Sequence, residues 1–488
     1  MSVTTRGPLP GGEYDVTVIG AGVVGSAIAR ELARFPLRTA LVEARDDVGD
    51  GTSKANTAIL HTGFDAVPGS LESRLVREGS GLLAAYAAES GIPVEPLGAL
   101  LVAWDEDQLG VLPGLAAKAR RNGRHDTRII TAEEVRAREP ELGPGVLGAL
   151  EVPGESVICP WTTTLAYATQ AVRSGVDLHL NCRVTSITSG PRPAPDDVHT
   201  PHTRHALHTR HALHTLHTVR GPLRTRHLVN AAGLHADRID RLLGHADFTV
   251  TPRRGQLIVF DELARGLVRH ILLPVPTALG KGVLVTPTVH GKVMLGPTAE
   301  DLDDRTATGS TAEGLALLRE KGRRILPALL DEEVTAVYAG LRAATASEDY
   351  AIRAHPAQRY VTVGGIRSTG LTASMAIAAH VVELLAEGGL PLSGARDPRP
   401  VRMPNLGEAF PRPYRDAGMI AADPEYGRIV CHCERVTRGE IRDALAATIP
   451  PGSLDGLRRR TRARAGRCQG FHCGAAVRAL FESEEPHR

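Results

Sequence analysis

Four of the six cysteines lie near the end of the chain, in two closely spaced pairs. The first pair is Cys431-His-Cys433, and the second pair is Cys468 and Cys473. Crowded cysteines seldom form structural disulfides in a cytoplasmic chain, so ligation of metal is the expected role. Four thiolates can satisfy either a 2Fe-2S cluster or a tetrahedral zinc ion, and the residues alone leave both open.

A second chemical signal stands near the start of the chain, in the motif Gly20-Ala-Gly22-Val-Val-Gly25. Gly20 permits a tight turn, Gly22 lets the backbone approach a pyrophosphate, and Gly25 allows close helix–strand packing. A helix that begins here points its N-terminus at the negative charge. Glu43 follows about twenty residues later, where a carboxylate can bind ribose hydroxyls. The pattern predicts a dinucleotide site, but the motif alone does not separate FAD from NAD.

The elements expected around this motif form a βαβ unit, with a strand over 14–20, a helix over 23–35 and a second strand over 39–43. Two later strands, over 227–233 and 360–365, also end in small residues. One nucleotide-binding domain is therefore expected to be assembled from distant segments. Such scattered contacts favour the longer cofactor, FAD.

The stretches between those segments have a different character. Residues 244–297 are rich in Val, Ile, Leu and Thr with turn residues between them, which predicts a mixed or antiparallel sheet. The expected fold class is α/β, with a Rossmann-like FAD-binding domain built from discontinuous segments, a mixed-sheet substrate domain and a small helical four-cysteine iron–sulfur module. The expected boundaries are 13–390 for the oxidoreductase with its substrate domain inserted at about 94–154 and 246–332, 391–425 for a linker, and 426–482 for the 2Fe-2S module.

Composition is that of an ordinary globular protein, with 488 residues, a hydrophobic fraction of 42% and a net charge of +2. The overall charge gives no reason to expect a nucleic-acid or membrane partner. No signal-peptide pattern opens the chain, and no run reaches the roughly 18 apolar residues of a spanning helix, so a cytoplasmic location is expected. Histidines recur at every third residue from 199 to 217, which predicts a surface loop between two strands and leaves its function open.

Several motifs together resemble a known family. The segment from Thr52 to Gly63 (TSKANTAILHTG) is similar to the isoalloxazine-side loop of the D-amino-acid-oxidase superfamily, and in particular to its glycerol-3-phosphate oxidase/dehydrogenase branch. The similarity continues through TPRRGQ (251–256), PTALGKGVLVTP (276–287), LGPTAED (295–301), AGLRAATASEDYAIR (339–353) and GGIRSTGLTAS (364–374). Beyond the phosphate loop and Glu43, the resemblance implies that FAD contacts Thr52, Ser53, Asn56, Val184, Ala232, Gly233, Gly365, Gly370, Leu371 and Thr372.

The same resemblance implies roles for four further side chains. His61 would take the hydroxyl proton while hydride passes to the flavin, a role that suits histidine because the ordinary pKa of an imidazole lies near working pH. A structural histidine and a covalent flavin link are the alternatives. Arg342 and Lys281 would hold an anionic substrate, although either could be a solvated surface cation. Ser368 would donate to substrate or flavin, or serve as a turn or cap residue.

The tail resembles the bacterioferritin-associated-ferredoxin type of 2Fe-2S module, with the two cysteine pairs flanking a helical stretch over 438–447. The same module is fused to the large subunit of anaerobic glycerol-3-phosphate dehydrogenase. Zinc remains the alternative ion. Six arginines between 458 and 467 suit charge compensation or docking of an acidic redox partner better than binding of nucleic acid.

The function implied is oxidation of a small anionic secondary alcohol, with sn-glycerol 3-phosphate giving dihydroxyacetone phosphate. Electrons would pass from FAD to the 2Fe-2S centre and on to a redox protein or a quinone-linked, peripheral membrane partner. The alternatives are a 2-hydroxy-acid (2-hydroxyglutarate-like) dehydrogenase, an amine or amino-acid dehydrogenase, and a non-enzymatic four-cysteine zinc protein that regulates or binds nucleic acid. The sequence leaves open the substrate, the acceptor and the oligomeric state.

Overall fold

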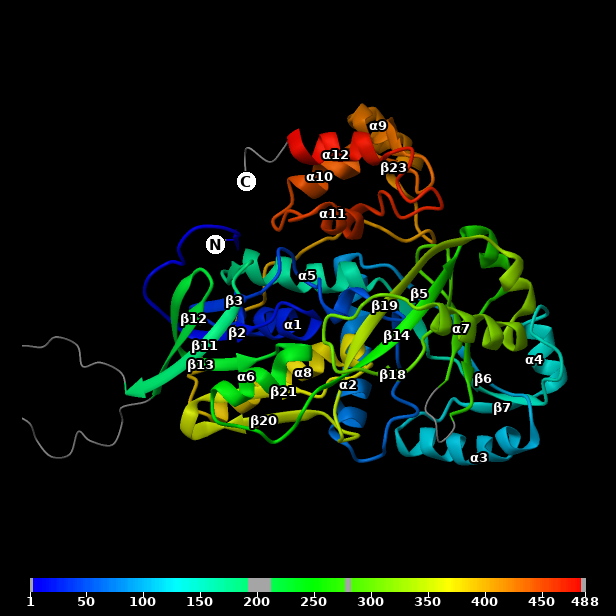
Figure 1. Cartoon of the computed structure of the whole chain (residues 1–488), viewed down its shortest axis with the longest axis horizontal. Helices are drawn as coiled ribbons and strands as arrows, with labels where there is room; N and C mark the ends of the chain where they lie inside the picture. Colours follow the sequence, from blue (N-terminus) through cyan, green and yellow to red (C-terminus); the bar gives the residue numbers. More distant parts are fainter. Residues whose placement is uncertain (1–2, 192–211, 277–281, 484–488) are drawn as a thin grey trace, which may run out of the picture.

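The computed structural model describes residues 3–191, 212–276 and 282–483. Its first part is built on a parallel sheet with the strand order β10-β3-β2-β13-β21, extended by β1 (Val3–Thr4) beside β10 (Figure 1). These strands are distant in sequence: β2 is Glu13–Ile19, β3 Thr39–Val42, β10 Asp177–His179, β13 Gly221–Asn230 and β21 Tyr360–Gly364. The expected α/β domain assembled from separated segments is confirmed.

Helices cover this sheet. Helix α1 (Val23–Leu32) packs between α5 (Pro160–Arg173) and α8 (Gly370–Glu387), and α2 (Leu71–Ser90) packs on α8. Helix α1 ends three residues before the expected bound, where the chain turns at Ala33 to re-enter the sheet. Helix α8 is long and apolar enough to cross a membrane, but most of it is buried against its neighbours, as in the core helix of a globular protein.

Strand β13 also begins an antiparallel meander with β12 (Ala212–Thr218) and β11 (Val184–Pro191), while β20 (Ala351–His355) pairs with β21 and α6 (Ala236–Leu242) packs nearby. The end of the histidine repeat belongs to β12, so the expected loop is wrong there. His214 is fully buried, between the Ser189 hydroxyl at 2.8 Å and the Gln358 carbonyl at 2.7 Å. The rest of the repeat, 199–211, lies outside the described residues.

The second part is a mixed sheet with the order β18-β14-β17-β16-β15-β6-β8-β7, in which only β6 and β15 pair in parallel. This confirms the mixed-sheet substrate domain. Its strands are β6 (Ala99–Ala103), β7 (Arg128–Thr131), β8 (Gly148–Val152), β14 (Thr251–Phe260), β15 (Ile271–Pro274), β16 (Leu284–Pro287), β17 (Val293–Gly296) and β18 (Glu300–Asp301). Helices α3 (Glu106–Arg121), α4 (Ala132–Arg138) and α7 (Ala312–Ile325) cover it.

Strand β19 (Val334–Ala344) pairs with β14 and, among the described strands, with no other, so it forms an edge of this sheet. Side chains from two other segments reach that edge. The Thr52 hydroxyl donates to the Leu341 carbonyl at 2.8 Å, and the Gln469 amide donates to the Thr335 carbonyl. The edge is therefore covered from one side by the 52–56 segment and from the other by the C-terminal part.

Between the two sheets lies a small three-stranded sheet of β4 (Ile59–Leu60), β9 (Ser156–Ile158) and β5 (Val94–Pro96). It brings the 52–63 segment next to the turn that joins β8 to β9. This small sheet places residues 61 and 62 beside residue 155, which becomes important in the candidate site.

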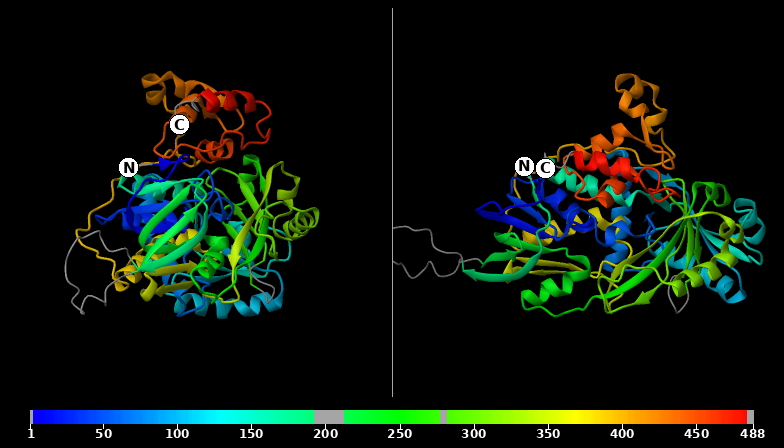
Figure 2. Two further views of the ribbon diagram at one scale, coloured as in Figure 1. Left: turned by 60° about the vertical axis from the view of Figure 1, so that its left-hand side comes forward. Right: turned by 45° about the horizontal axis from the view of Figure 1, so that its top comes forward.

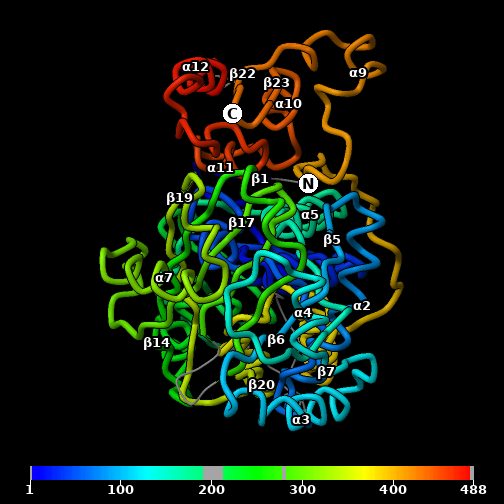
Figure 3. The backbone as a smooth tube through the Cα atoms, turned by 90° about the vertical axis from the view of Figure 1, so that its right-hand side faces the viewer, coloured from blue at the N-terminus to red at the C-terminus, as the bar shows by residue number. Residues whose placement is uncertain are grey.

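The C-terminal module stands above both larger parts, at the top of Figures 1 and 3, and Figure 2 shows it from two further sides. It contains β22 (Ile429–Cys431), β23 (Val436–Thr437), α10 (Arg438–Leu445), α11 (Leu454–Thr461) and α12 (Gly474–Ser483), with the short α9 (Ala417–Ala422) before it. Thr437 and Glu440 form a capping box that starts α10. The expected linker is anchored to the module, because Arg412 is buried between Glu408 and Glu440 at 3.1 Å each.

Candidate active site

The glycine motif follows β2 and opens α1. Gly20 has a φ of +100°, and a side chain there would come within 2.6 Å of the Ala231 carbonyl oxygen. A Cβ at Gly25 would lie 1.9 Å from the Gly20 carbonyl, so this position admits glycine alone. Gly22 caps α1, and its missing Cβ leaves the helix N-terminus open except for the Ser53 hydroxyl. This bare turn with a helix N-terminus fits a pyrophosphate.

Glu43 follows β3 and lies beside the motif. Its carboxylate accepts hydrogen bonds from the backbone N–H of Ala21 at 2.8 Å and of Arg45 at 3.0 Å. Burial raises the pKa of Glu43, while these backbone donors oppose the shift. A carboxylate fixed in this way next to the phosphate turn suits a ribose.

The 52–56 segment returns to the same turn. The Ser53 hydroxyl accepts from the Val23 N–H at 2.9 Å, at the first residue of α1. Asn56 folds the segment locally, donating to the Ser53 carbonyl at 2.9 Å and accepting from the Ala58 N–H at 2.7 Å. Thr52 ties it to β19. The segment therefore joins the phosphate turn to the second sheet.

The other expected cofactor contacts gather at the carboxyl ends of the parallel strands, where ligands of such sheets bind. Ala232 and Gly233 follow β13, and Gly233 has a φ of +54°. Gly365 follows β21 with a φ of +64°. Val184 opens β11, close behind Cys182, whose N–H donates to the Glu43 carbonyl at 2.7 Å. The first turn of α8 contributes Gly370, Leu371 and Thr372.

His61 is held from two directions. Its backbone N–H donates to the buried Thr372 hydroxyl at 3.0 Å, and its ring Nδ1 lies 3.0 Å from a carboxylate oxygen of Glu155. Glu155 is fully buried, and its other oxygen accepts from the Thr62 N–H at 2.7 Å and the Thr62 hydroxyl at 2.8 Å. Because a carboxylate only accepts, Nδ1 carries the proton in this contact, and in a neutral imidazole Nε2 is then the nitrogen that can accept.

Arg342 lies on β19 and is largely enclosed. Its guanidinium donates to the Thr298 carbonyl at 2.7 Å. Within the described ranges no carboxylate forms an ion pair with it, since the nearby Asp301 is engaged by Arg253. Burial, with a contribution from Arg253, lowers the pKa of Arg342 to about 10, so the group stays protonated at neutral pH. This cation has capacity left for an anion.

The two remaining candidates are placed differently. Ser368 is exposed in the turn between β21 and α8, while its neighbours Arg367 and Thr369 both bind the carboxylate of Glu72. Lys281 lies outside the described residues. The segment 52–63 contacts β19 at one end and α8 at the other, and thereby links His61 with the strand that carries Arg342.

The four cysteines of the module lie two by two. Cys433 interacts with Cys468, and Cys473 with Cys431. Backbone N–H groups of His472, Gly470 and Phe471 point at the Cys468 sulfur and lower its pKa. No three His, Cys, Asp or Glu side chains of the described chain converge on one metal position. Paired thiols with backbone donors fit a 2Fe-2S cluster, in which each iron takes two thiolates, better than one tetrahedral zinc ion.

Sequence reasoning missed two residues that the structure places against these groups. Glu155 supports His61, and Asp47, also fully buried, binds two arginines of the module. Neither has a motif around it, because both partners are distant in sequence. Three arginines of the run, Arg459, Arg460 and Arg462, are buried in ion pairs within the chain, so these three do not face a redox partner.

Two protein families match separate parts of the chain. Residues 15–384 match the family described as FAD dependent oxidoreductase. Residues 429–483 match the BFD-like [2Fe-2S] binding domain. The division follows the change from the two-sheet body to the C-terminal module.

Individual relatives match over long stretches. A glycerol 3-phosphate dehydrogenase of Caloramator mitchellensis is 34% identical over 96% of this chain and 94% of its own. The human mitochondrial L-2-hydroxyglutarate dehydrogenase is 28% identical over 59% of this chain and 61% of its own. Among solved structures, the dithionite-reduced L-alpha-glycerophosphate oxidase of Mycoplasma pneumoniae with FAD bound has a TM-score of 0.68 at 28% identity, covering 81% of this chain and 98% of that chain.

Proposed function

We propose, from the premise that this chain belongs to the FAD-dependent oxidoreductase family and carries a BFD-like 2Fe-2S binding domain, that it is a dehydrogenase of a small anionic secondary alcohol. The substrate we propose is sn-glycerol 3-phosphate, oxidised to dihydroxyacetone phosphate. Membership of an enzyme family removes the alternative of a zinc-binding regulatory or nucleic-acid-binding protein. The fit of the paired thiols likewise favours iron over zinc.

The observation that carries the proposal is the pairing of His61 with the buried Glu155. An alcohol can lose hydride only if its hydroxyl proton is taken up as the carbonyl forms. Nε2 of His61 would accept that proton, and Glu155 would stabilise the imidazolium through Nδ1–H. Bound FAD supplies the hydride acceptor, and the 2Fe-2S centre supplies one-electron transfer to an acceptor.

Substrate charge would be met by Arg342, with Lys281 as a second cation. A guanidinium binds phosphate in a two-pronged contact, and the partial burial of Arg342 leaves less water to weaken that contact. Ser368 is kept as an auxiliary donor, at the exposed turn that precedes α8. In this arrangement His61 would take the proton of the carbinol hydroxyl while Arg342 would hold the anionic end of the substrate.

Dehydrogenase is preferred to oxidase because of the module. The dehydrogenase relative aligns over nearly the whole chain, whereas the oxidase structure covers less of it. A one-electron relay serves little purpose if oxygen meets the reduced flavin directly. We propose a redox protein or a quinone-linked partner at the membrane surface as acceptor, a cytoplasmic location, and the domain limits 13–390, 391–425 and 426–482.

The second candidate is a 2-hydroxy-acid dehydrogenase. A buried guanidinium grips a carboxylate as well as a phosphate, and a relative named for L-2-hydroxyglutarate shares part of the chain. Anaerobic mixing of the purified enzyme with glycerol 3-phosphate, 2-hydroxyglutarate and a set of amines separates these possibilities. Rapid bleaching of the flavin by glycerol 3-phosphate alone supports the proposal. Faster bleaching by a hydroxy acid or an amine would contradict the proposal and identify a dehydrogenase of that substrate class.

A further inference from the structure

Helix α11 of the C-terminal module docks on the FAD-binding part through a buried carboxylate. Asp47 is fully buried, and Arg459 and Arg460 are buried beside it. Arg460 grips Asp47 with both ends of its guanidinium, at 2.6 and 2.7 Å, and Arg459 adds a bond of 2.7 Å. A two-pronged contact fixes direction as well as charge, so Asp47 is held in one orientation.

Asp47 belongs to the segment that supports the phosphate turn. Three hydrogen bonds connect this segment, residues 43–53, to the turn, one through its backbone and two through the side chains of Glu43 and Ser53. The Ala21 N–H donates to Glu43, the Gly49 N–H donates to the Ala21 carbonyl at 2.9 Å, and the Val23 N–H donates to Ser53. Movement of residue 47 would therefore displace the backbone that faces the pyrophosphate.

A second set of ion pairs secures the far end of the segment. Arg459 also bonds Asp50 at 2.8 Å, and Asp50 pairs with Lys54 at 2.8 Å. Lys54 in turn lies 3.2 Å from Asp455 of α11. Ser53 is thus flanked by residues that the module holds in place.

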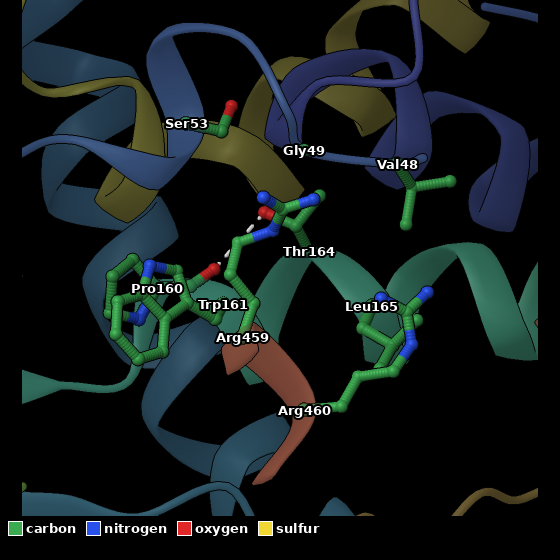
Figure 4. Close-up of a pocket in the computed structure, with 9 residues that line it drawn as sticks. All are labelled: Val48, Gly49, Ser53, Pro160, Trp161, Thr164, Leu165, Arg459 and Arg460. Carbon is green, nitrogen blue, oxygen red and sulfur yellow. Dashed lines mark hydrogen bonds between the residues drawn. The ribbon is translucent and has the colours of Figure 1, made fainter. Parts of the chain in front are cut away.

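The region of the module around α11 and the 43–53 segment approach each other as closely as their backbones allow. A Cβ at Gly452 would lie 2.3 Å from the Asp46 carbonyl, and one at Gly456 would lie 2.7 Å from the Asp47 carboxylate. A small pocket at the junction is lined by Gly49 and Ser53 of the segment and by Arg459 and Arg460 of α11, and Figure 4 shows these residues. Close packing of this kind transmits a displacement instead of absorbing it.

We propose that Arg459 and Arg460 are positioning residues for FAD, acting through Asp47. A buried carboxylate that loses its partners must move toward water, because an unpaired buried charge is strongly unfavourable. Undocking of the module would then release the 43–54 segment from the phosphate turn and weaken the hold on FAD. By linkage, bound FAD favours the docked module to the same extent.

The test compares Arg460→Gln with Arg442→Gln, which removes an exposed arginine of the same module paired with Asp423 and Asp443. Each protein is stripped of FAD and titrated with it without substrate, following quenching of flavin fluorescence, while iron content reports whether the module is intact. We expect about tenfold weaker FAD binding for Arg460→Gln, as for loss of a charge-assisted hydrogen bond. The control should stay within about twofold of wild type.

Two further variants keep the outcome decisive. Asp47→Asn removes the carboxylate from the FAD-binding side, so it tests the same contact even if Arg460→Gln fails to fold. The double variant should bind FAD no more weakly than the worse single variant, since both changes break one contact. Additive losses would exclude action through Asp47, and wild-type affinity of both single variants would overturn the proposal. Because no substrate is present, the result is independent of the substrate assignment.

Discussion

His61 and Arg342 occupy different situations in the candidate site. His61 is held by its own protein at two points, with a buried carboxylate on Nδ1 and a hydroxyl on its backbone N–H, and only Nε2 is left for a ligand among the described contacts. Arg342 is enclosed but makes a hydrogen bond only to a backbone carbonyl among the described residues. Under the proposed function, the difference predicts that His61 is oriented before substrate arrives, whereas Arg342 gains a charged partner only when an anion binds. The predictions that follow test this contrast.

The largest effect is expected at His61. His61→Ala should slow flavin reduction at saturating substrate by about 10²- to 10⁴-fold, the usual contribution of a positioned general base. Substrate affinity should change little, because the anion is held elsewhere. Rapid mixing under anaerobic conditions measures both. The exposed His125→Ala serves as control, and equal rates for the two variants would remove His61 from the chemistry.

Arg342→Lys should act on affinity instead. It keeps the charge but loses the planar fork, so kcat/KM should fall by roughly ten- to a hundred-fold. The rise in KM should exceed the fall in kcat. Arg353→Lys, which changes an exposed arginine paired with Asp247 at 2.9 Å, is the matched control. Wild-type kinetics for Arg342→Lys with every anion tried would mean that the anchor lies elsewhere.

Glu155→Gln should have a smaller effect in the same direction as His61→Ala. The amide can still accept from Thr62, but it no longer stabilises a charged imidazolium. Flavin reduction should slow by about tenfold with KM unchanged, as for one charge-assisted hydrogen bond. A changed KM with an unaltered reduction rate would assign Glu155 a purely structural part.

Loss of the cluster itself should change neither the step assigned to His61 nor the binding assigned to Arg342. Cys433→Ser should abolish the iron–sulfur signal while the rate of flavin bleaching per bound flavin stays within about twofold, because the thiols lie in a separate module. Cys182→Ser, a buried cysteine outside the module, controls for loss of a thiol. Slower bleaching in Cys433→Ser alone would show that the cluster affects the first half of the reaction.

The parts that could be predicted from the sequence are those whose physics is local. Gly20, Gly22 and Gly25 stand at fixed spacing within one turn, where Gly20 adopts a positive φ and Gly25 packs on the Gly20 carbonyl, and the cysteine pairs are close in sequence. Glu155 could not be found in this way, because its role depends on a small sheet that joins residues 59–60 to 156–158. A sequence does not show that a carboxylate is buried when the residues that bind it are distant in the chain.

The same reasoning explains the errors. The six arginines between 458 and 467 are expected to compensate cluster charge or to dock an acidic redox partner, because they lie beside the cysteines. Three of them are buried because Asp47, Glu434 and Glu408, from three different segments, supply the opposite charge. His214 is expected in a loop, yet residues 212–218 form a strand because they pair with β11 on one side and β13 on the other.

The position of strand β19 at the edge of its sheet determines how a truncated form of this chain should behave. Its edge is covered by the 52–56 segment at Leu341 and by the C-terminal module at Thr335, and the exposed Val334 and Val337 lie toward the end that the module covers. An uncovered edge with apolar side chains is a template for pairing with another molecule. In the intact chain Gln469 bonds Thr335 on that edge. A protein truncated before the module would therefore tend to self-associate in solution, whatever it retained of its chemistry.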